Sequence, residues 1–406
     1  MGAWPSYLRN GPISVAIGEQ TTVTDPSESS ADPEEGPHLL KAALEEQLDG
    51  CRVSRILGVG GVSACFAANI HPYGDVAVKV TWKGSEGGSS WLAEAAEAEL
   101  DVYQRLGQAP STAAIAARAH FAGDLIIRGQ SHPYMVMQRL GRNLEAVACS
   151  GLATAKFVQY ALEMLHCLEV LHITGLVHLD VKPANFCLRQ WHHHLFQDRQ
   201  QSPKAPSICI IDLGGCSTCP TLMEAGRPAS FFGTTEYAGT TALQMLRPGP
   251  ADDLESLAYS LLFMWNHGTL PWDFAEHRLS MEGGVWSREQ LRTMLEERNM
   301  LWKLACEDET TIPPFIRRIR NYATRLQVWE LPDYSYMRKQ IKAAPRQRRS
   351  SMDGCSLREG ARACKRARHQ SPETQPGKKA KLWSSPDSTH PPAKAAPVPL
   401  LLRAEE

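Results

Sequence analysis

The sequence lacks any long hydrophobic run. No stretch among its 406 residues approaches the roughly 18 consecutive apolar residues that a membrane-spanning helix requires. The N-terminus also lacks the basic start and the apolar run of a secretory signal. These absences argue against a transmembrane protein, and we expect a protein of the cytoplasm, the nucleus or both.

The sequence also has little that would build a disulfide framework or a metal cluster. Its eleven Cys are spaced irregularly, which is typical of a reducing compartment where thiols pack as small buried hydrophobes. Cys216 and Cys219 form a lone CxxC pair, and zinc would need two more ligands nearby. His192, His193 and His194 are adjacent, so their side chains point apart, and no Cys or carboxylate set surrounds them. We favour a solvated loop over a metal site there.

The net charge of −1 hides an uneven distribution of charge along the chain. Residues 1–50 carry nine acidic and two basic side chains, whereas residues 344–406 carry thirteen basic and six acidic ones. Between these ends the apolar periodicity is sustained, and an apolar content of 43% can fill a sizeable core. We predict an acidic disordered segment over 1–49, a folded domain over 50–343 and a basic disordered tail over 344–406.

The motif HLDVKPAN, residues 178–185, places three polar side chains at the intervals of a phosphoryl-transfer site. Asp180 would orient a substrate hydroxyl and accept its proton. Lys182 would offset charge on the moving phosphoryl group, and Asn185 would hold a magnesium ion. The motif therefore predicts a catalytic loop.

A glycine-rich turn joins two predicted strands, ILGVGGVSACFAA and DVAVKV. Gly58, Gly60 and Gly61 would let backbone N–H groups close over phosphate oxygens, because a Cβ there would hold the chain away. Ser63 replaces the third glycine of the usual pattern, and a simple turn is the alternative. Lys79 on the second strand favours the phosphate site, since its ammonium could reach the alpha and beta phosphates.

Two carboxylates complete the predicted site. Glu99 interrupts the apolar stripe of a helix, WLAEAAEAELDVYQRL, and a carboxylate there is costly unless it is paired, with Lys79 as the obvious partner. A solvated Glu at the edge of the stripe is the alternative. Asp212 ends the strand SICIID and precedes Leu213 and Gly214, so it could chelate magnesium, although strand-end Asp residues are commonly turn residues.

Taken together, these motifs resemble the protein kinase superfamily, and KP after the Asp of HLDVKPAN is the Ser/Thr form. The segments VMQRLGRNLE, FFGTTEYAGT, DDLESLAYSLLFMWNHGTLPW and LPDYSYM are similar to the casein kinase 1 clan, which includes the tau-tubulin and vaccinia-related kinases. The resemblance implies an α+β bilobal fold, with a mostly β N-lobe over about 50–140 and a mainly helical C-lobe over about 141–343. It also implies ATP and Mg²⁺ as cofactors and proteins as substrates.

The same resemblance implies further site residues. The hinge after Met137 would bond adenine through backbone near Leu140, Thr234 would brace the catalytic Asp and Lys, and Asp253 would hold the catalytic loop from below. The ATP-binding set also includes Ala77, with Cys65 as the roof and Cys187 as the floor. Small apolar packing is the expected role of both thiols, and the further hypothesis is that a thiol-reactive nucleotide analogue inactivates the protein through one of them.

Three features depart from the family pattern. Leu179 replaces the Arg that reads an activation-segment phosphate in many kinases, so we do not expect such switching. Glu236 stands where casein kinase 1 carries the Arg of GTARYA, and the reversed charge would repel an anion. A long loop, RQWHHHLFQDRQQSPKAPS, separates Asn185 from Asp212.

Three functional classes remain open from the sequence. The leading reading is an active Ser/Thr protein kinase, and the alternative is a pseudokinase or scaffold, against which the full set of catalytic residues argues. A third reading is a nucleic-acid tether that acts through the tail, where CKRARHQSPETQPGKKAK has the form of a bipartite nuclear import signal. We favour an import receptor over nucleic acid as the partner of this tail, with plain solubility as the competing account. Ser371 and Ser385 precede Pro and could be phosphorylated to tune it.

Overall fold

The computed structural model describes six ranges of the chain, all within one compact unit, Met1–Arg362: residues 35–60, 63–82, 90–189, 207–274, 286–308 and 311–344. Gly61, the histidine-containing loop and the basic tail lie outside the described residues. Their predicted roles therefore stay predictions. Within the described ranges, no helix is long and apolar enough to cross a membrane.

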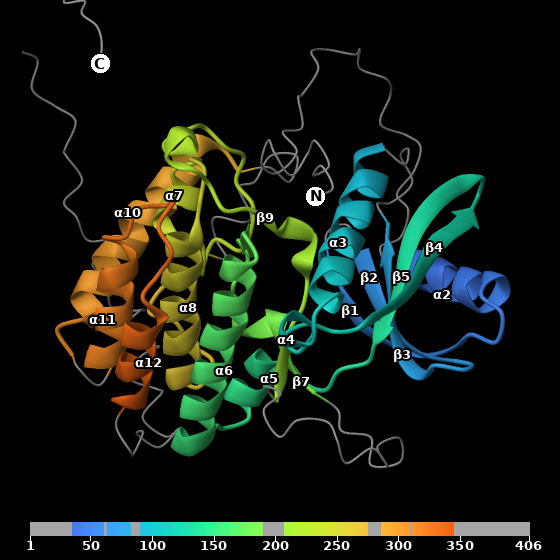
Figure 1. The fold of residues 1–406 in the computed structure, drawn as a ribbon, viewed down its shortest axis with the longest axis horizontal. Helices are drawn as coiled ribbons and strands as arrows, with labels where there is room; N and C mark the ends of the chain where they lie inside the picture. Colours follow the sequence, from blue (N-terminus) through green and yellow to red (C-terminus); the bar gives the residue numbers. More distant parts are fainter. Residues whose placement is uncertain are drawn as a thin grey trace, which may run out of the picture. The chain divides into compact units, whose positions relative to one another are not determined.

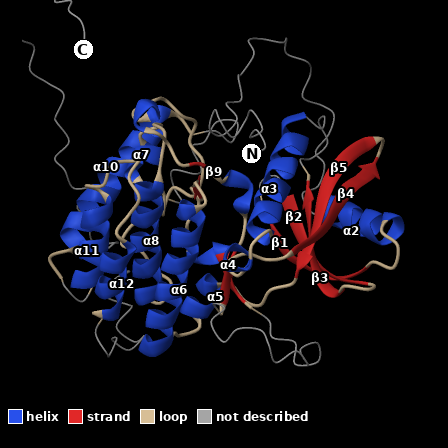
Figure 2. Ribbon diagram, in the orientation of Figure 1, coloured by secondary structure: helices blue, strands red, loops and turns tan. Residues whose placement is uncertain are grey.

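A five-stranded antiparallel sheet forms the N-lobe, with the spatial order β1-β2-β3-β5-β4 (Figures 1 and 2). The strands are β1 (Arg52–Val59), β2 (Ser63–Ile70), β3 (Gly74–Thr81), β4 (Ala119–Ile127) and β5 (Gln130–Gln138). Because side chains alternate along a strand, Val78 and Val80 share one face of the sheet and Ala77 and Lys79 share the other. This alternation directs Lys79 toward α3 (Ser90–Gly107), with which it pairs.

A helix that the sequence did not predict, α2 (Glu35–Gln47), packs on the sheet face opposite α3. Leu40 and Leu44 are fully buried in one apolar cluster with Val78 and its neighbours, and Figure 1 shows α2 and α3 on either side of the strands. The Gln47 side chain donates to the Ile126 carbonyl and accepts from its N–H, both at 2.8 Å, which ties α2 to edge strand β4. The expectation of disorder over 1–49 is therefore wrong for the residues of this helix. The sequence did not reveal the helix because its apolar stripe is only three turns long and lies among acidic residues.

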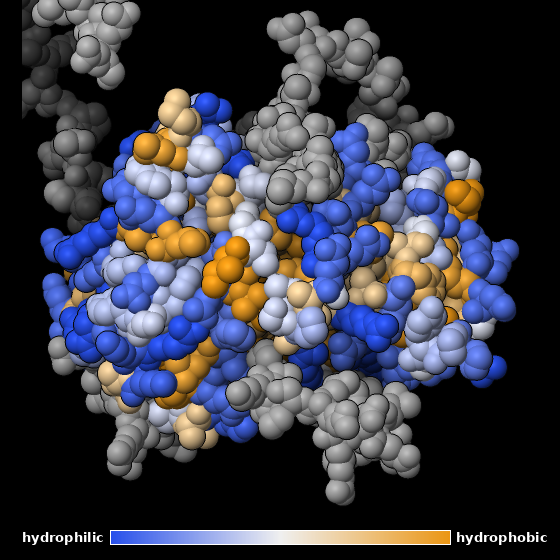
Figure 3. All heavy atoms as spheres, viewed as in Figure 1, coloured by the Kyte–Doolittle hydropathy of each residue, from blue (hydrophilic) through white to orange (hydrophobic). Residues whose placement is uncertain are grey.

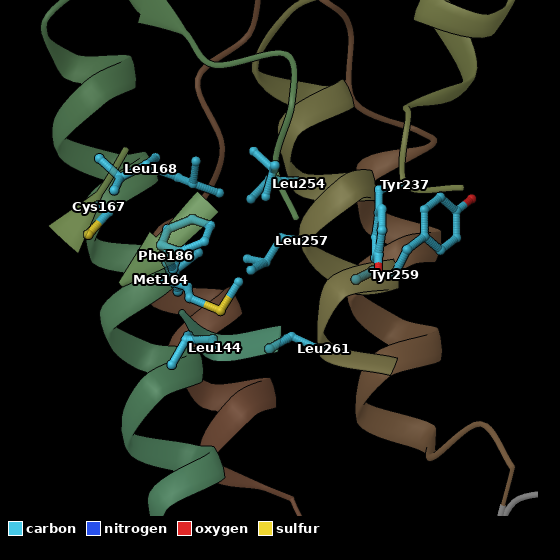
Figure 4. Packing of buried hydrophobic residues seen from close by; sticks show 14 of the residues in the cluster. Leu144, Met164, Cys167, Leu168, Phe186, Tyr237, Leu254, Leu257, Tyr259 and Leu261 are labelled. Atoms are coloured by element: carbon cyan, nitrogen blue, oxygen red, sulfur yellow. The ribbon is translucent and has the colours of Figure 1, made fainter. Parts of the chain in front are cut away.

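Helices build the C-lobe around α8 (Pro250–Trp265), every residue of which is buried. Its Leu254, Leu257 and Leu261 interleave with side chains of α6 (Thr154–Ile173) (Figure 4). The other helices of the C-lobe are α5 (Leu144–Cys149), α7 (Thr240–Leu243), α10 (Arg288–Ala305), α11 (Pro314–Ala323) and α12 (Tyr334–Lys342), whereas the short helix α4 (Pro110–Ala113) lies between α3 and β4 in the chain. The β-rich N-lobe and helical C-lobe confirm the predicted bilobal α+β fold.

Two short ladders place the catalytic segments at the edge of the C-lobe. β6 (Leu176–Val177) pairs with β9 (Ser217–Thr218), and β7 (Phe186–Leu188) pairs with β8 (Ile208–Ile210). The HLDVKPAN motif connects β6 to β7, and residues 211–216, which include Asp212, connect β8 to β9. Since both ladders are antiparallel, the two polar segments leave the same edge and meet.

Candidate active site

The β3 lysine, the α3 glutamate and the strand-end aspartate form one ion-paired group. Lys79 Nζ lies 2.8 Å and 2.7 Å from the two carboxylate oxygens of Glu99, and 2.8 Å from Asp212 Oδ1. Glu99 is only 5% exposed, so a solvated Glu at the edge of a stripe is ruled out. The predicted pairing of Lys79 with Glu99 is therefore present.

The charge states of this group follow from its contacts. Burial alone would lower the pKa of Lys79, but the Glu99 and Asp212 carboxylates outweigh burial and raise that pKa above its ordinary value. Burial alone would raise the pKa of Asp212, but the Lys79 ammonium outweighs burial and holds that pKa below its ordinary value. At neutral pH the site thus presents a fixed ammonium and an ionised carboxylate.

Three side chains hold Asp180: two from the catalytic loop, Lys182 and Asn185, and Thr234 from a later segment. Thr234 Oγ1 donates to Asp180 Oδ1 at 2.8 Å, while Lys182 Nζ lies 2.8 Å from Asp180 Oδ2 and donates to Thr234 Oγ1 at 2.8 Å. Asn185 Nδ2 donates to the Asp180 backbone carbonyl at 2.9 Å and to Oδ2 at 3.1 Å. The structure thus brings together the four residues that the motifs singled out, and a carboxylate has further lone pairs with which to accept a substrate hydroxyl.

Asp253, the first-turn residue of α8, suspends this loop by its backbone. Its carboxylate accepts from the N–H of His178 at 2.7 Å and from the N–H of Leu179 at 2.8 Å, and a ring nitrogen of His172 lies 2.9 Å away. Burial alone would raise the pKa of Asp253, but the bonds from His172 and His178 bring it below its ordinary value. The predicted support from below is present, and all three partners are buried.

Leu179 is held in an uncommon conformation at the centre of the motif. Its φ of +69° lies in the left-handed region, which is unfavourable for a branched side chain, and it is 6% exposed. Gly233, at φ +109°, passes so close that an added Cβ would lie 2.5 Å from the Leu179 carbonyl oxygen. Leu179 is therefore a packed core residue with no charge to offer a phosphate.

Sequence analysis did not identify two residues that contribute to this site. Tyr103, expected only as part of the apolar stripe of α3, accepts a hydrogen bond through its hydroxyl oxygen from the Asp212 N–H at 3.2 Å. His178 Nδ1 accepts from the Asp180 N–H at 3.2 Å, so its proton lies on Nε2, which is 3.1 Å from the Ile211 carbonyl. The only signals available were a tyrosine on a largely apolar stripe and a histidine two residues before the catalytic Asp.

The residues predicted to surround the nucleotide lie on β2, β3, β5 and β7. Cys65 pairs with Lys79 across β2 and β3, Ala77 pairs with Met137 across β3 and β5, and Cys187 lies on β7. Leu140, near which the hinge backbone is predicted to bond adenine, is partly buried and packs against the main core. Burial raises the pKa of Cys65 to about 11 and that of Cys187 to about 12, so both are protonated thiols at neutral pH.

The glycine-rich turn is described on both sides of its tip. Gly58 pairs with Cys65 in the β1–β2 ladder, and the Gly60 N–H donates to the Ser63 carbonyl at 2.7 Å. The tip itself, including Gly61, is outside the described residues. Phosphate binding by this turn stays a prediction.

The donor set fits a magnesium ion. Asn185 and Asp212 offer amide and carboxylate oxygens, the hard ligands that Mg²⁺ prefers, and the Asp212 side chain is 47% exposed. Two protein ligands suffice because Mg²⁺ keeps several waters and binds substrate phosphates. Within the described ranges, no group of three His, Cys, Asp or Glu side chains is placed to hold a metal ion.

Glu236 lies in the segment beyond the catalytic loop and is fixed by its surroundings. Trp272 Nε1 donates to its backbone carbonyl at 2.9 Å, and Thr235 Oγ1 donates to its carboxylate at 3.0 Å. Position 236 thus carries a carboxylate side chain on a backbone that Trp272 holds in place.

Comparison with known proteins agrees with this geometry. The protein kinase domain model matches residues 51–328, which is more than half of the chain. A probable casein kinase I homolog of Encephalitozoon cuniculi is 27% identical over 264 residues, covering 63% of this chain and 78% of that protein. The casein kinase 1-like protein HD16 of Oryza sativa subsp. japonica is 35% identical over 147 residues, covering 34% of this chain and 19% of that protein. The chain therefore belongs to the protein kinase family and is of the casein kinase 1 type.

Proposed function

We propose that this chain is an active Ser/Thr protein kinase that transfers the γ-phosphoryl group of ATP, with Mg²⁺, to hydroxyl groups of protein substrates. The observation that carries the proposal is the ion-paired group of Lys79, Glu99 and Asp212, at 2.7–2.8 Å, beside a braced Asp180. A scaffold has no need for the buried Glu99 carboxylate and the largely buried Lys79 ammonium, which are costly to maintain.

Each side chain has a distinct part in the proposed reaction. Lys79, held by Glu99, would bind nucleotide phosphates, and Asn185 with Asp212 would hold the metal. Bound magnesium–ATP supplies a transferable phosphoryl group whose charge is partly neutralised. Asp180 would orient the substrate hydroxyl and accept its proton.

The remaining parts of the mechanism come from the bracing residues. Lys182 lies beside Asp180, so its ammonium would offset charge on the phosphoryl group during transfer. Thr234 keeps both side chains in one orientation because it accepts from the lysine and donates to the carboxylate. Catalysis of this kind is positioning plus electrostatics, with little covalent work for the protein.

The test is transfer of radiolabelled phosphate from ATP and magnesium to casein or to the chain itself. We expect transfer by the pure wild-type protein and a loss of about a hundredfold or more in Asp180→Ala and in Lys79→Met. No transfer by folded wild type would overturn the proposal in favour of a pseudokinase. Equal transfer by all three proteins would identify a contaminating kinase.

We also propose that residues 345–406 direct the protein to the nucleus by binding an import receptor. Two basic clusters separated by a short polar spacer support this proposal. A fluorescent fusion of the full chain should accumulate in nuclei, and a fusion that ends at residue 344 should not. Equal distribution of the two fusions would contradict it.

A further inference from the structure

A groove on the C-lobe lies outside the catalytic machinery. It has a volume of about 350 Å³ and is formed by α11, the turn that follows and the start of α12. Figure 1 shows α11 and α12 on the side of the C-lobe away from the N-lobe sheet. The groove is lined by Arg318, Asn321, Tyr322, Arg325, Leu326, Glu330 and Tyr336. This volume is within the range of sites that bind small ligands or a few side chains.

The two cations of the groove come from α11 and from the turn that follows it. Arg318, Asn321 and Tyr322 follow the i, i+3, i+4 pattern of one face of α11, and Arg325 lies in the turn after the helix. Arg318 donates through Nε to Gln340 at 2.6 Å, and its terminal nitrogens have no partner in the described part of the chain. Across the same ranges, the Arg325 guanidinium has no hydrogen bond or ion pair. Two exposed guanidinium groups are thus available to a ligand.

The neighbouring arginines differ because they already serve the fold. Arg320 bonds Tyr259 and Asn299 and lies 3.5 Å from the Glu255 carboxylate, and Arg338 is ion-paired with a carboxylate of α6. Residues 311–344 carry seven Lys or Arg and two Asp or Glu, and the visible surface over these helices is mostly hydrophilic (Figure 3). Among the arginines of residues 311–344, the two whose guanidinium groups remain available to a ligand, Arg318 and Arg325, therefore both line the groove.

Two tyrosines give the groove an aromatic wall. The rings of Tyr322 and Tyr336 lie 5.3 Å apart at 36°, and the Tyr322 hydroxyl accepts from the Asp333 N–H at 2.8 Å, which fixes its ring. Glu330 also lines the groove, with its carboxylate accepting from the Gln327 N–H at 3.1 Å. This carboxylate opposes a nucleic-acid backbone, which brings a negative charge at every step, more than a peptide whose carboxylates are separate.

We propose that this groove docks an acidic segment of a partner protein. A carboxylate of the partner binds between Arg318 and Arg325, whose planar donors suit carboxylates, and an adjacent aromatic side chain packs on Tyr322 and Tyr336. The acidic segment would thereby be recognised far from the active-site cleft, where the negative charge of Glu236 would repel it. The inference goes beyond the proposed phosphoryl transfer and does not depend on it.

The test is fluorescence polarisation with the full chain and the fluorescein-labelled peptide GEEFEEG, with GQQFQQG as the uncharged control. We expect saturable binding of the acidic peptide alone. The double variant Arg318→Gln with Arg325→Gln should raise its Kd at least tenfold. The matched variant Lys339→Gln with Lys342→Gln removes two exposed charges from α12 outside the groove and should change Kd less than twofold.

Three outcomes would overturn the proposal. The first is no saturable binding of GEEFEEG by wild type, and the second is an equal loss in both variants, which would indicate general charge attraction. The third is tighter binding of a 20-nucleotide single-stranded DNA that is lost in the groove variant, which would make the site a nucleic-acid surface. Circular dichroism of the variants checks that each is folded, and transfer to a substrate peptide without acidic residues should stay unchanged in both.

Discussion

Asp253→Asn should destabilise the protein and remove phosphate transfer, although it changes a single atom far from any solvent. The carboxylate accepts from two backbone N–H groups, of His178 and Leu179, and contacts the His172 ring. An amide of the same shape keeps one acceptor oxygen and turns the other position into a donor. Whichever way the amide lies, at least one buried N–H faces another donor.

The size of the effect follows from these contacts. One buried N–H without an acceptor costs about 1–3 kcal/mol, and the loss of charge from the two remaining bonds costs about 1 kcal/mol each. We expect the free energy of unfolding to fall by about 3–5 kcal/mol. The left-handed conformation of Leu179 is no longer held, so Asp180 is displaced and phosphate transfer falls with it.

Guanidinium unfolding at pH 7, followed by tryptophan fluorescence, measures the change. Asp333→Asn is the matched control, because Asp333 is an exposed N-cap and Asn caps a helix equally well. The pKa of Asp253 is depressed in the folded state, so its stabilisation is present above its ordinary value of 3.8 and is lost as pH falls below that value. The difference between wild type and variant should thus be constant from pH 7 to about 5. A variant within about 1 kcal/mol of wild type would refute the role of Asp253.

Three further predictions concern the N-lobe and the nucleotide site. Glu99→Gln should lower phosphate transfer at least tenfold with the chain still folded, because a neutral amide cannot form an ion pair with Lys79. Transfer within twofold of wild type would contradict this. Leu44→Ala should lower the free energy of unfolding by about 2–5 kcal/mol, whereas Leu39→Ala, at a residue 36% exposed, should cost far less; equal effects would show that α2 is not anchored. A thiol-reactive ATP analogue should label Cys65 faster than Cys187, because Cys65 is half-buried and Cys187 is buried. Labelling should accelerate as pH rises from 7 to 9, because burial raises the pKa of both thiols. Peptide mapping by mass spectrometry identifies the labelled thiol, and full inactivation of the double Ala variant would refute this route.

The positions of the catalytic residues could be predicted well because short local constraints decide them. The intervals within HLDVKPAN place Asp180, Lys182 and Asn185 on one loop, and strand alternation directs Lys79 to one face of the sheet. The pairing of Lys79 with Glu99 followed from the cost of an unpaired carboxylate on an apolar stripe. Their presence together in the structure leaves their catalytic roles as predictions that the proposed assays address.

Other features could not be predicted because they depend on contacts between distant segments. The hydroxyl of Tyr103 meets the N–H of Asp212, 109 residues away, and nothing local distinguishes this tyrosine from a core aromatic. The helix α2 was hidden for a related reason, since its few apolar residues gain burial only from strands that follow it in the chain.

The sequence by itself determined which side chains carry charge into the site, through their spacing, and the resemblance of its motifs to the protein kinase superfamily indicated the family and the two-lobed architecture. Tertiary structure alone decided how that charge is held. Ion pairing outweighs burial, so it raises the pKa of Lys79 and lowers that of Asp212. Leu179 adopts its conformation because Asp253 and Gly233 close on it from other segments. The unpaired arginines beside Tyr322 are likewise a tertiary fact, since the sequence shows a run of basic residues but not which of them the fold has already used.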